Sequence, residues 1–223
     1  MEKERISYHE SVRRVYDRIK EDGMNNIWDR YEAQGMGGNP DQRCPFCMGG
    51  VRCDLCSNGP CRADVAKDKR GVCGITGDGM AMRMMLLRNV LGASTYHYHT
   101  EQTIKTLRAT ARGKTPFRII EKDKLKVFTG RLGLATSGAV EKTALALCNS
   151  VEADFNRKAD EPSQIVEALA PDERKKTWKN LDLFPGGIYG EMMRATSSCL
   201  TNVDGYYVSL ALKAMRLSIA MAY

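Results

Sequence analysis

The feature that most constrains this 223-residue chain is a run of six cysteines within thirty residues. Their spacing is C-x2-C-x5-C-x2-C-x4-C-x11-C, and they are Cys44, Cys47, Cys53, Cys56, Cys61 and Cys73. Glycine and proline are frequent between them, and the segment has neither helical nor strand periodicity. We therefore expect residues 41–75 to form a loop whose shape is organised by what its thiolates bind.

Thiolates bind soft metals, and a C-x2-C pair turns two sulfurs toward one ion or cluster. Glycines let the backbone approach a cluster closely, and the cluster's sulfides accept hydrogen bonds from N–H groups. The small residues beside the cysteines are Gly49, Gly50, Gly59, Pro60, Gly71 and Gly74. The pattern therefore indicates an iron–sulfur protein that carries electrons.

The number of cysteines also bears on assembly. One cubane takes four ligands, and the last four cysteines form one natural set: Cys53, Cys56, Cys61 and Cys73. Cys44 and Cys47 remain, and two thiolates do not complete a site. A two-fold axis would add the same pair from a second copy. We therefore expect a homodimer with a shared cluster at its axis.

Zinc is the main alternative, because the first four cysteines, from Cys44 to Cys56, have the spacing of a compact zinc knuckle. The two further cysteines, the glycine-rich setting and the lack of a nearby histidine favour iron–sulfur. The net charge is +7, which would suit nucleic acid, but basic residues are interleaved with acidic ones. Phe46 is the one aromatic residue among the cysteines. We expect no nucleic-acid partner.

The chain has no feature of an exported or membrane protein. Its first ten residues are charged and lack the apolar core of a signal peptide. The apolar stretch 203–223 is interrupted by charges that oppose membrane insertion. We expect a cytoplasmic protein, where thiols stay reduced and clustered cysteines indicate metal. Cys148 and Cys199 lie alone on predicted helices and are expected to be inert core residues.

Apolar residues at three- and four-residue spacing predict a mainly α fold with almost no strand. We predict a cysteine-rich cluster-binding domain at residues 1–75 and a helical domain at 76–223. The last helix is still periodic at Tyr223 and has no stop signal, so we expect the chain to be the front part of something longer.

The expected helices are 4–34 with a break at Gly23, one capped by Thr76 or Asp78, 100–112, 139–156, 162–180, 189–197 and 203–223. The helix after Thr76 is expected to bury a stripe made of Met80, Met84, Leu87 and Leu91.

Two segments resemble the N-terminal signature of nickel–iron carbon monoxide dehydrogenases. They are residues 52–62, with the sequence RCDLCSNGPCR, and residues 71–76, with the sequence GVCGIT. The sequence CPFC at 44–47 is similar to the short-spaced form of the family's first cysteine pair. Residues 27–31 and the methionine-rich helix after Cys73 resemble the form found with acetyl-CoA synthase.

This resemblance implies a [4Fe–4S] cluster within each subunit, bound by Cys53, Cys56, Cys61 and Cys73. It implies that Cys44 and Cys47 share a second cluster, [4Fe–4S] or [2Fe–2S], across the dimer axis. The implied reaction converts CO and water to CO2, two protons and two electrons at a separate nickel–iron–sulfur cluster. Ferredoxin is the implied electron partner, and an acetyl-CoA synthase subunit is a further candidate partner.

The sequence also departs from that family. Its Rossmann-like domains, which carry the nickel-site ligands, are absent, so we expect the chain alone to be inactive toward CO. A non-catalytic, ferredoxin-like carrier is the alternative function. The related hybrid-cluster proteins fit less well, because their spacing leaves Cys53 and Cys73 unused.

The chain has three histidines. We expect His9 on the surface of the first helix. His99 matches one position of a proton relay in the resembled family, and histidine suits that role because its pKa lies near neutral. Tyr96 and Gln102 replace other relay positions. The alternative is that His97 and His99 form a hydrogen-bonded pair at a helix junction.

Overall fold

The computed structural model describes residues 7–26, 29, 51–64, 67–200 and 203–223. The chain divides into two compact units, Met1–Arg52 and Cys53–Tyr223, and each is described by itself. The predicted functional division at residue 75 stays a prediction. Among the described residues, no helix combines the length and the apolar character that crossing a membrane requires.

In the first unit the described helix is α1 (Glu10–Glu21). The helix ends at Glu21, and Gly23 follows its C-cap with a φ of +67° that suits glycine, so the predicted break is confirmed. Tyr16 is buried, and its hydroxyl donates a hydrogen bond to Asp29 Oδ1 at 3.4 Å. The neighbouring Val15 is exposed. The remainder of the predicted helix 4–34 falls mostly outside the described residues.

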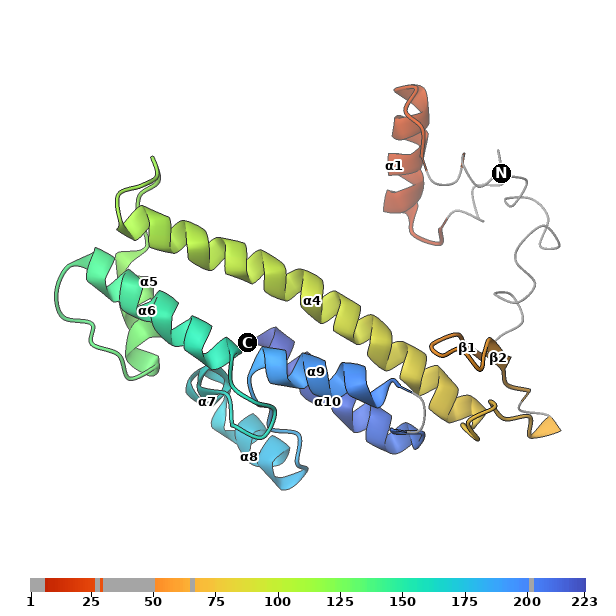
Figure 1. The fold of residues 1–223 in the computed structure, drawn as a ribbon. Coiled ribbons are helices and arrows are strands. Elements are labelled where there is room, and N and C mark those ends of the chain that lie inside the picture. The colour runs from red at the N-terminus through yellow and green to blue at the C-terminus, as the bar shows by residue number, and fades with distance from the viewer. Residues whose placement is uncertain (1–6, 27–28, 30–50, 65–66, 201–202) are drawn as a thin grey trace. The chain divides into compact units, whose positions relative to one another are not determined.

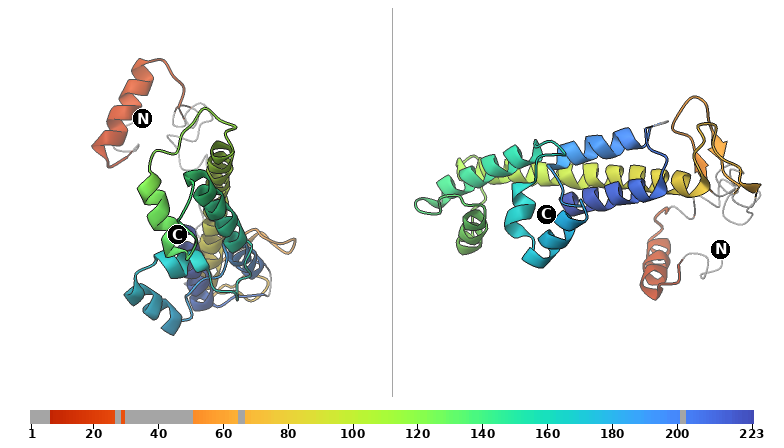
Figure 2. Two further views of the ribbon diagram at one scale, coloured as in Figure 1. Left: turned by 90° about the vertical axis from the view of Figure 1, so that its left-hand side faces the viewer. Right: turned by 90° about the horizontal axis from the view of Figure 1, so that it is seen from below.

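The second unit is built on one long helix, as Figure 1 shows, so the predicted mainly α fold is confirmed. Along α4 (Gly77–Ala111), the helices α9 (Ile188–Ser198) and α10 (Tyr207–Ala222) pack against the first part, and α6 (Val140–Phe155) against the later part. Figure 2 shows this arrangement from two further sides. The other elements are a two-stranded sheet of β1 (Arg52–Cys53) and β2 (Cys61–Arg62), and the helices α5 (Lys122–Arg131), α7 (Gln164–Leu169) and α8 (Asp172–Asn180).

The structure joins what the sequence analysis separated into two helices, one after Thr76 and one at 100–112. Thr76 caps α4 as predicted, because its Oγ1 accepts a hydrogen bond from the Gly79 N–H at 3.2 Å. The hydroxyls of Thr95, Thr100 and Thr103 each donate to the carbonyl four residues earlier, so they do not compete with the helix. The predicted separation was therefore wrong.

The predicted buried stripe was right at Met80 and partly at Leu87, which packs against the core, but it was wrong at Leu91. Met80 is fully buried, but Leu91 is 60% exposed. The buried face runs instead through Leu86, Val90 and Ala93. The reason is that α4 packs against α6, α9 and α10 in turn, so the position of its neighbours, rather than its apolar pattern, selects the buried face.

Two further differences concern helix boundaries. The predicted helix 162–180 is two helices, because Pro171 follows Ala170 and holds that residue in an extended conformation before α8 begins. The short helix α5 was not predicted. The predicted helices 139–156, 189–197 and 203–223 correspond to α6, α9 and α10.

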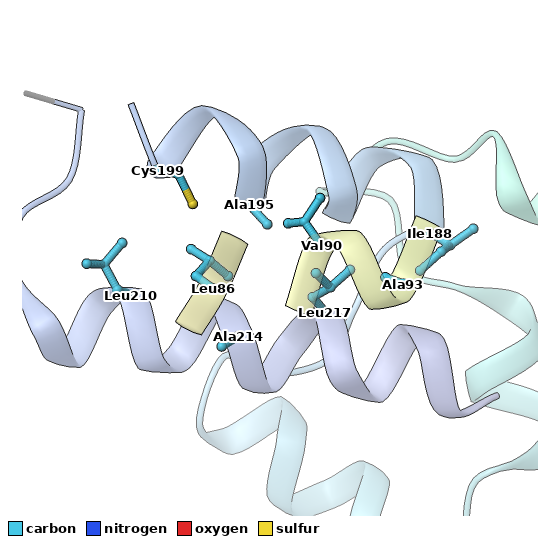
Figure 3. Packing of buried hydrophobic residues seen from close by; sticks show 9 residues of the cluster. All are labelled: Leu86, Val90, Ala93, Ile188, Ala195, Cys199, Leu210, Ala214 and Leu217. Atoms are coloured by element: carbon cyan, nitrogen blue, oxygen red, sulfur yellow. The ribbon is translucent and has the colours of Figure 1, made fainter. Parts of the chain in front are cut away.

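The core between α4, α9 and α10 consists of interlocking aliphatic side chains (Figure 3). Its buried members are Leu86, Val90, Ala93, Ile188, Ala195, Cys199, Leu210, Ala214 and Leu217. A second buried cluster joins the later part of α4 to α6 and α7, with Ile104, Leu147, Cys148, Val151 and Ile165. These two clusters hold α4 in place, and the cysteine-rich loop lies directly before its first residue.

Candidate iron–sulfur site

Four of the six clustered cysteines lie on successive pieces of one loop. Cys53 is in β1, Cys56 is in the turn that follows, Cys61 is in β2, and Cys73 is in the turn before α4. Cys53 is buried, and the other three are half-buried. Cys44 and Cys47, the predicted half-site, lie outside the described residues.

Gly59 brings three of these cysteine residues together. A Cβ atom placed on it would lie 3.3 Å from both the Cys53 carbonyl oxygen and the Cys61 backbone nitrogen. The same atom would lie 3.4 Å from the Cys56 carbonyl oxygen, which already accepts a hydrogen bond from the Gly59 N–H at 3.1 Å. The backbones of the three residues therefore surround a position that has little room for a side chain.

The turn that carries Cys73 is held beside Cys61. The Val72 N–H donates to Cys61 Sγ at an N–S distance of 3.5 Å. The Gly71 N–H donates to the Ile75 carbonyl oxygen at 2.9 Å, which closes the turn around Cys73. A Cβ atom on Gly71 would lie 2.8 Å from the side chain of Ile75 and 3.7 Å from Cys61 Cβ. The glycine therefore permits the close approach that the sequence analysis expected.

α4 adds a cation to this loop. Arg83 is only 2% exposed, and its Nη1 lies 3.9 Å from Cys73 Sγ. Its Nη2 donates to the carbonyl oxygen of Asp204, in the segment between α9 and α10, at 2.8 Å. Arg83 was not predicted as a site residue; the available signal was a single charge within the apolar run Met80–Leu87.

The described residues contain no group of three His, Cys, Asp or Glu side chains arranged to hold a single metal ion. A cubane distributes its four ligands over four iron atoms, so its thiolates need not converge on one point as zinc ligands do. The donor set suits a cubane in its chemistry: four reduced thiols share one glycine-lined loop, and N–H groups are directed at Cys61 and Cys73. The assignment of the four as a ligand set stays a prediction.

The histidines do not form a pair. His9 is exposed, as expected. His97 and His99 both lie inside the continuous helix α4, where residues two apart point in different directions. His97 is buried between the rings of Phe155 and Tyr189, and burial lowers its pKa below 6.5. His99 is exposed. The expected pair at a helix junction was therefore wrong, and a relay role for His99 stays a prediction.

The two isolated cysteines are buried, as expected for core residues. The Cys148 thiol donates to the Ile104 carbonyl oxygen at 3.7 Å, and the Cys199 thiol donates to that of Arg83 at 3.6 Å. Burial raises the pKa of both thiols. Leu55 of the cysteine-rich loop packs against the same core cluster as Cys199, so this core reaches the loop.

Comparison with known proteins places this loop in a family. The sequence profile of the Prismane/CO dehydrogenase family matches residues 51–223, which is most of the chain. The chain belongs to this family. It is 75% identical over 223 residues to carbon monoxide dehydrogenase 2 of Methanosarcina acetivorans, covering 100% of this chain and 35% of that protein. It is 43% identical over 217 residues to the carbon monoxide dehydrogenase of Archaeoglobus fulgidus, covering 97% and 33%.

The fold is also that of this family. A nickel-free crystal structure of carbon monoxide dehydrogenase from Thermococcus sp. AM4 superimposes with a TM-score of 0.82 at 28% identity, covering 99% of this chain and 34% of that one. This member of the Prismane/CO dehydrogenase family therefore spans about a third of the length of the relatives it matches. The predicted resemblance is confirmed at the level of the family.

Proposed function

We propose that this chain is the N-terminal, electron-transferring part of an anaerobic carbon monoxide dehydrogenase. Cys53, Cys56, Cys61 and Cys73 would hold its [4Fe–4S] cluster within each subunit. The observation that carries this proposal is the glycine-lined loop, in which the backbones of three of these cysteines surround Gly59 and the fourth is held beside Cys61.

The bound cluster would accept and release single electrons. The protein's own part is to hold the cluster and to direct hydrogen-bond donors at its ligands. The Val72 N–H faces Cys61, and the guanidinium of Arg83 faces Cys73. Such donors and charges set the reduction potential of an iron–sulfur site.

Cys44 and Cys47 complete the proposal as a half-site. Two copies of the chain would share a [4Fe–4S] or [2Fe–2S] cluster at the axis of a homodimer, because the pair supplies only half of a four-thiolate set. This second cluster would pass electrons between the subunits and toward ferredoxin.

In the whole enzyme, CO and water would yield CO2, two protons and two electrons at a nickel–iron–sulfur cluster. By the family resemblance, the ligands to that cluster would lie outside the third of the enzyme that this chain matches. The chain alone should therefore show no CO-dependent dye reduction, and turnover by the purified polypeptide would contradict this. The acetyl-CoA synthase subunit is proposed as a partner on the sequence resemblance alone.

Metal and sulfide analysis of the chain purified without oxygen tests the cluster. We expect a brown protein with equal amounts of iron and acid-labile sulfide, no nickel, and the mass of a dimer. Cys73→Ser should lower the iron and sulfide content. Cys148→Ser is the matched control: it alters a buried thiol far along the chain from the loop and should leave both contents unchanged.

The outcome that opposes this proposal is a colourless protein with zinc and no sulfide, which is the expectation of the zinc-knuckle alternative. Equal loss of iron in Cys73→Ser and Cys148→Ser would also contradict it, since that result would reflect instability rather than ligation. A cluster-loaded dimer that exchanges electrons with ferredoxin only when joined to the rest of the enzyme would exclude a free-standing carrier.

A further inference from the structure

Arg83 is a buried cation whose charge has no carboxylate partner among the described residues. Nη1 points at Cys73 Sγ, and Nη2 donates to the main-chain carbonyl oxygen of Asp204. Its Nε atom is buried and has no hydrogen-bond partner in the described structure. A guanidinium stays protonated in proteins, so this position carries a permanent positive charge.

A second buried arginine of the same unit, Arg216, has the carboxylate partner that Arg83 lacks among the described residues. Arg216 on α10 directs its Nε at the carboxylate of Glu191, 2.6 Å away, and that carboxylate is itself buried. Lys213 is likewise paired with Asp204. Burying a charge without compensation is costly, and natural proteins usually pair it. Arg83 therefore requires an anion in the place where its guanidinium points.

The direction of that guanidinium identifies the anion. It faces Cys73 Sγ, at the edge of the cysteine-rich loop, and the carbonyl oxygen on its other side is neutral. A cubane with four thiolate ligands carries a net negative charge, and it becomes more negative when it takes up an electron. The missing counter-charge and the predicted cluster are therefore complementary.

We infer that Arg83 is the fixed counter-charge of the cluster ligated through Cys73, and that it raises the reduction potential of that cluster. The inference rests on the proposed function. Reduction adds one electron to the cluster and breaks no bond, so a fixed positive charge at the ligand stabilises the reduced form more than the oxidised form. Arg83 acts through Cys73 and is a positioning residue, not a catalytic one.

The test measures the potential of this cluster alone. A Cys44→Ser/Cys47→Ser background removes the half-site, so the spectrum of the reduced full-length chain reports one cluster. An electron paramagnetic resonance titration with dithionite as reductant then compares Arg83→Met, Arg83→Lys and Arg88→Met. Arg88 is the matched control, because it lies on the exposed side of the same helix and the same charge is removed.

We expect Arg83→Met to lower the midpoint potential by at least a tenfold change in the one-electron equilibrium, about 59 mV. Arg83→Lys keeps the charge and should shift it by less than half as much, and Arg88→Met should leave it unchanged. A fully loaded Arg83→Met protein with the parental potential would overturn the inference, and so would an equal shift in Arg88→Met. A purely structural role would lower the unfolding temperature without moving the potential.

If Arg83→Met fails to take up a cluster, Arg83→Lys decides. The inference is supported if Arg83→Lys takes up the cluster and its midpoint potential shifts by less than half of that amount. It is overturned if the one-electron equilibrium of Arg83→Lys changes tenfold or more, or if this variant also fails to take up the cluster. Failure of the proposed function is distinguishable, because the background protein with Arg83 intact would then hold no iron or sulfide at all.

Discussion

Glu191→Gln should destabilise the helical unit strongly, because it leaves a buried guanidinium without its counter-charge. Glu191 on α9 is 2% exposed, and its Oε1 accepts hydrogen bonds from Arg216 Nε at 2.6 Å and from the Gly186 N–H at 2.7 Å. Glutamine keeps the shape of the side chain and removes its charge. The other carboxylate near Arg216 belongs to Asp182, whose side chain is 96% exposed and is screened by water.

Removing one partner of a buried ion pair costs about 3–5 kcal/mol of unfolding free energy, whereas an exposed pair contributes about 0–1 kcal/mol. Each kcal/mol shifts the unfolding temperature of a chain this long by about 2–4 °C. Glu191→Gln should therefore lower the unfolding temperature by about 6–20 °C. Glu167→Gln is the control: Glu167 pairs with Lys179, both about half exposed, and the loss should stay below about 4 °C.

Far-ultraviolet circular dichroism, which follows helix content, monitors the thermal and urea unfolding of both variants. The double variant Glu191→Gln/Arg216→Met tests the stated cause, since it removes the uncompensated charge as well. It should be more stable than Glu191→Gln alone. Equal losses in Glu191→Gln and Glu167→Gln, or a double variant that is less stable than the single one, would refute the reasoning.

Three further predictions concern α4. Leu86→Ala, at a fully buried position, should cost about 2–5 kcal/mol in urea unfolding, whereas Leu91→Ala should stay within about 0.5 kcal/mol because Leu91 is exposed. Thr76→Ala removes the helix cap and should cost about 1 kcal/mol in the same assay. The hydrogen bond that Tyr189 donates to Glu101 raises the pKa of Tyr189 from 10.0 to about 12. Ultraviolet titration of Glu101→Gln should show that pKa returning toward 10.0, and the stability from this bond, complete below pH 10.0, should be lost as the pH rises toward 12.

The sequence was informative where a local rule decides the outcome. Thr76 and Gly23 were recognised from capping and breaking rules, which depend on a few neighbouring residues. The buried face of α4 was not, because α4 is apolar on several sides and three other helices select which side is covered. Leu86 and Leu91 have the same intrinsic preference and differ only in what packs against them.

The same distinction between local rules and distant contacts applies to the candidate site. The spacing of the cysteines and glycines was sufficient to predict a loop with close backbone approaches, since a glycine acts locally, as at Gly59 and Gly71. Arg83 was not identified, because its contacts are with Cys73, ten residues earlier in a turn, and with Asp204, which is 121 residues away in the chain. Sequence spacing carries no information about such a distant carbonyl group.

The continuity of α4 has a mechanical consequence. The helix starts at Gly77, four residues after Cys73 and directly after its cap Thr76, and continues for 35 residues, about 52 Å at the usual helical rise. It contains no proline, so it has no hinge of the kind that this residue introduces. A redox partner that binds at a given residue of α4 would therefore lie at a distance from Cys73 that is fixed by the number of helical residues between them.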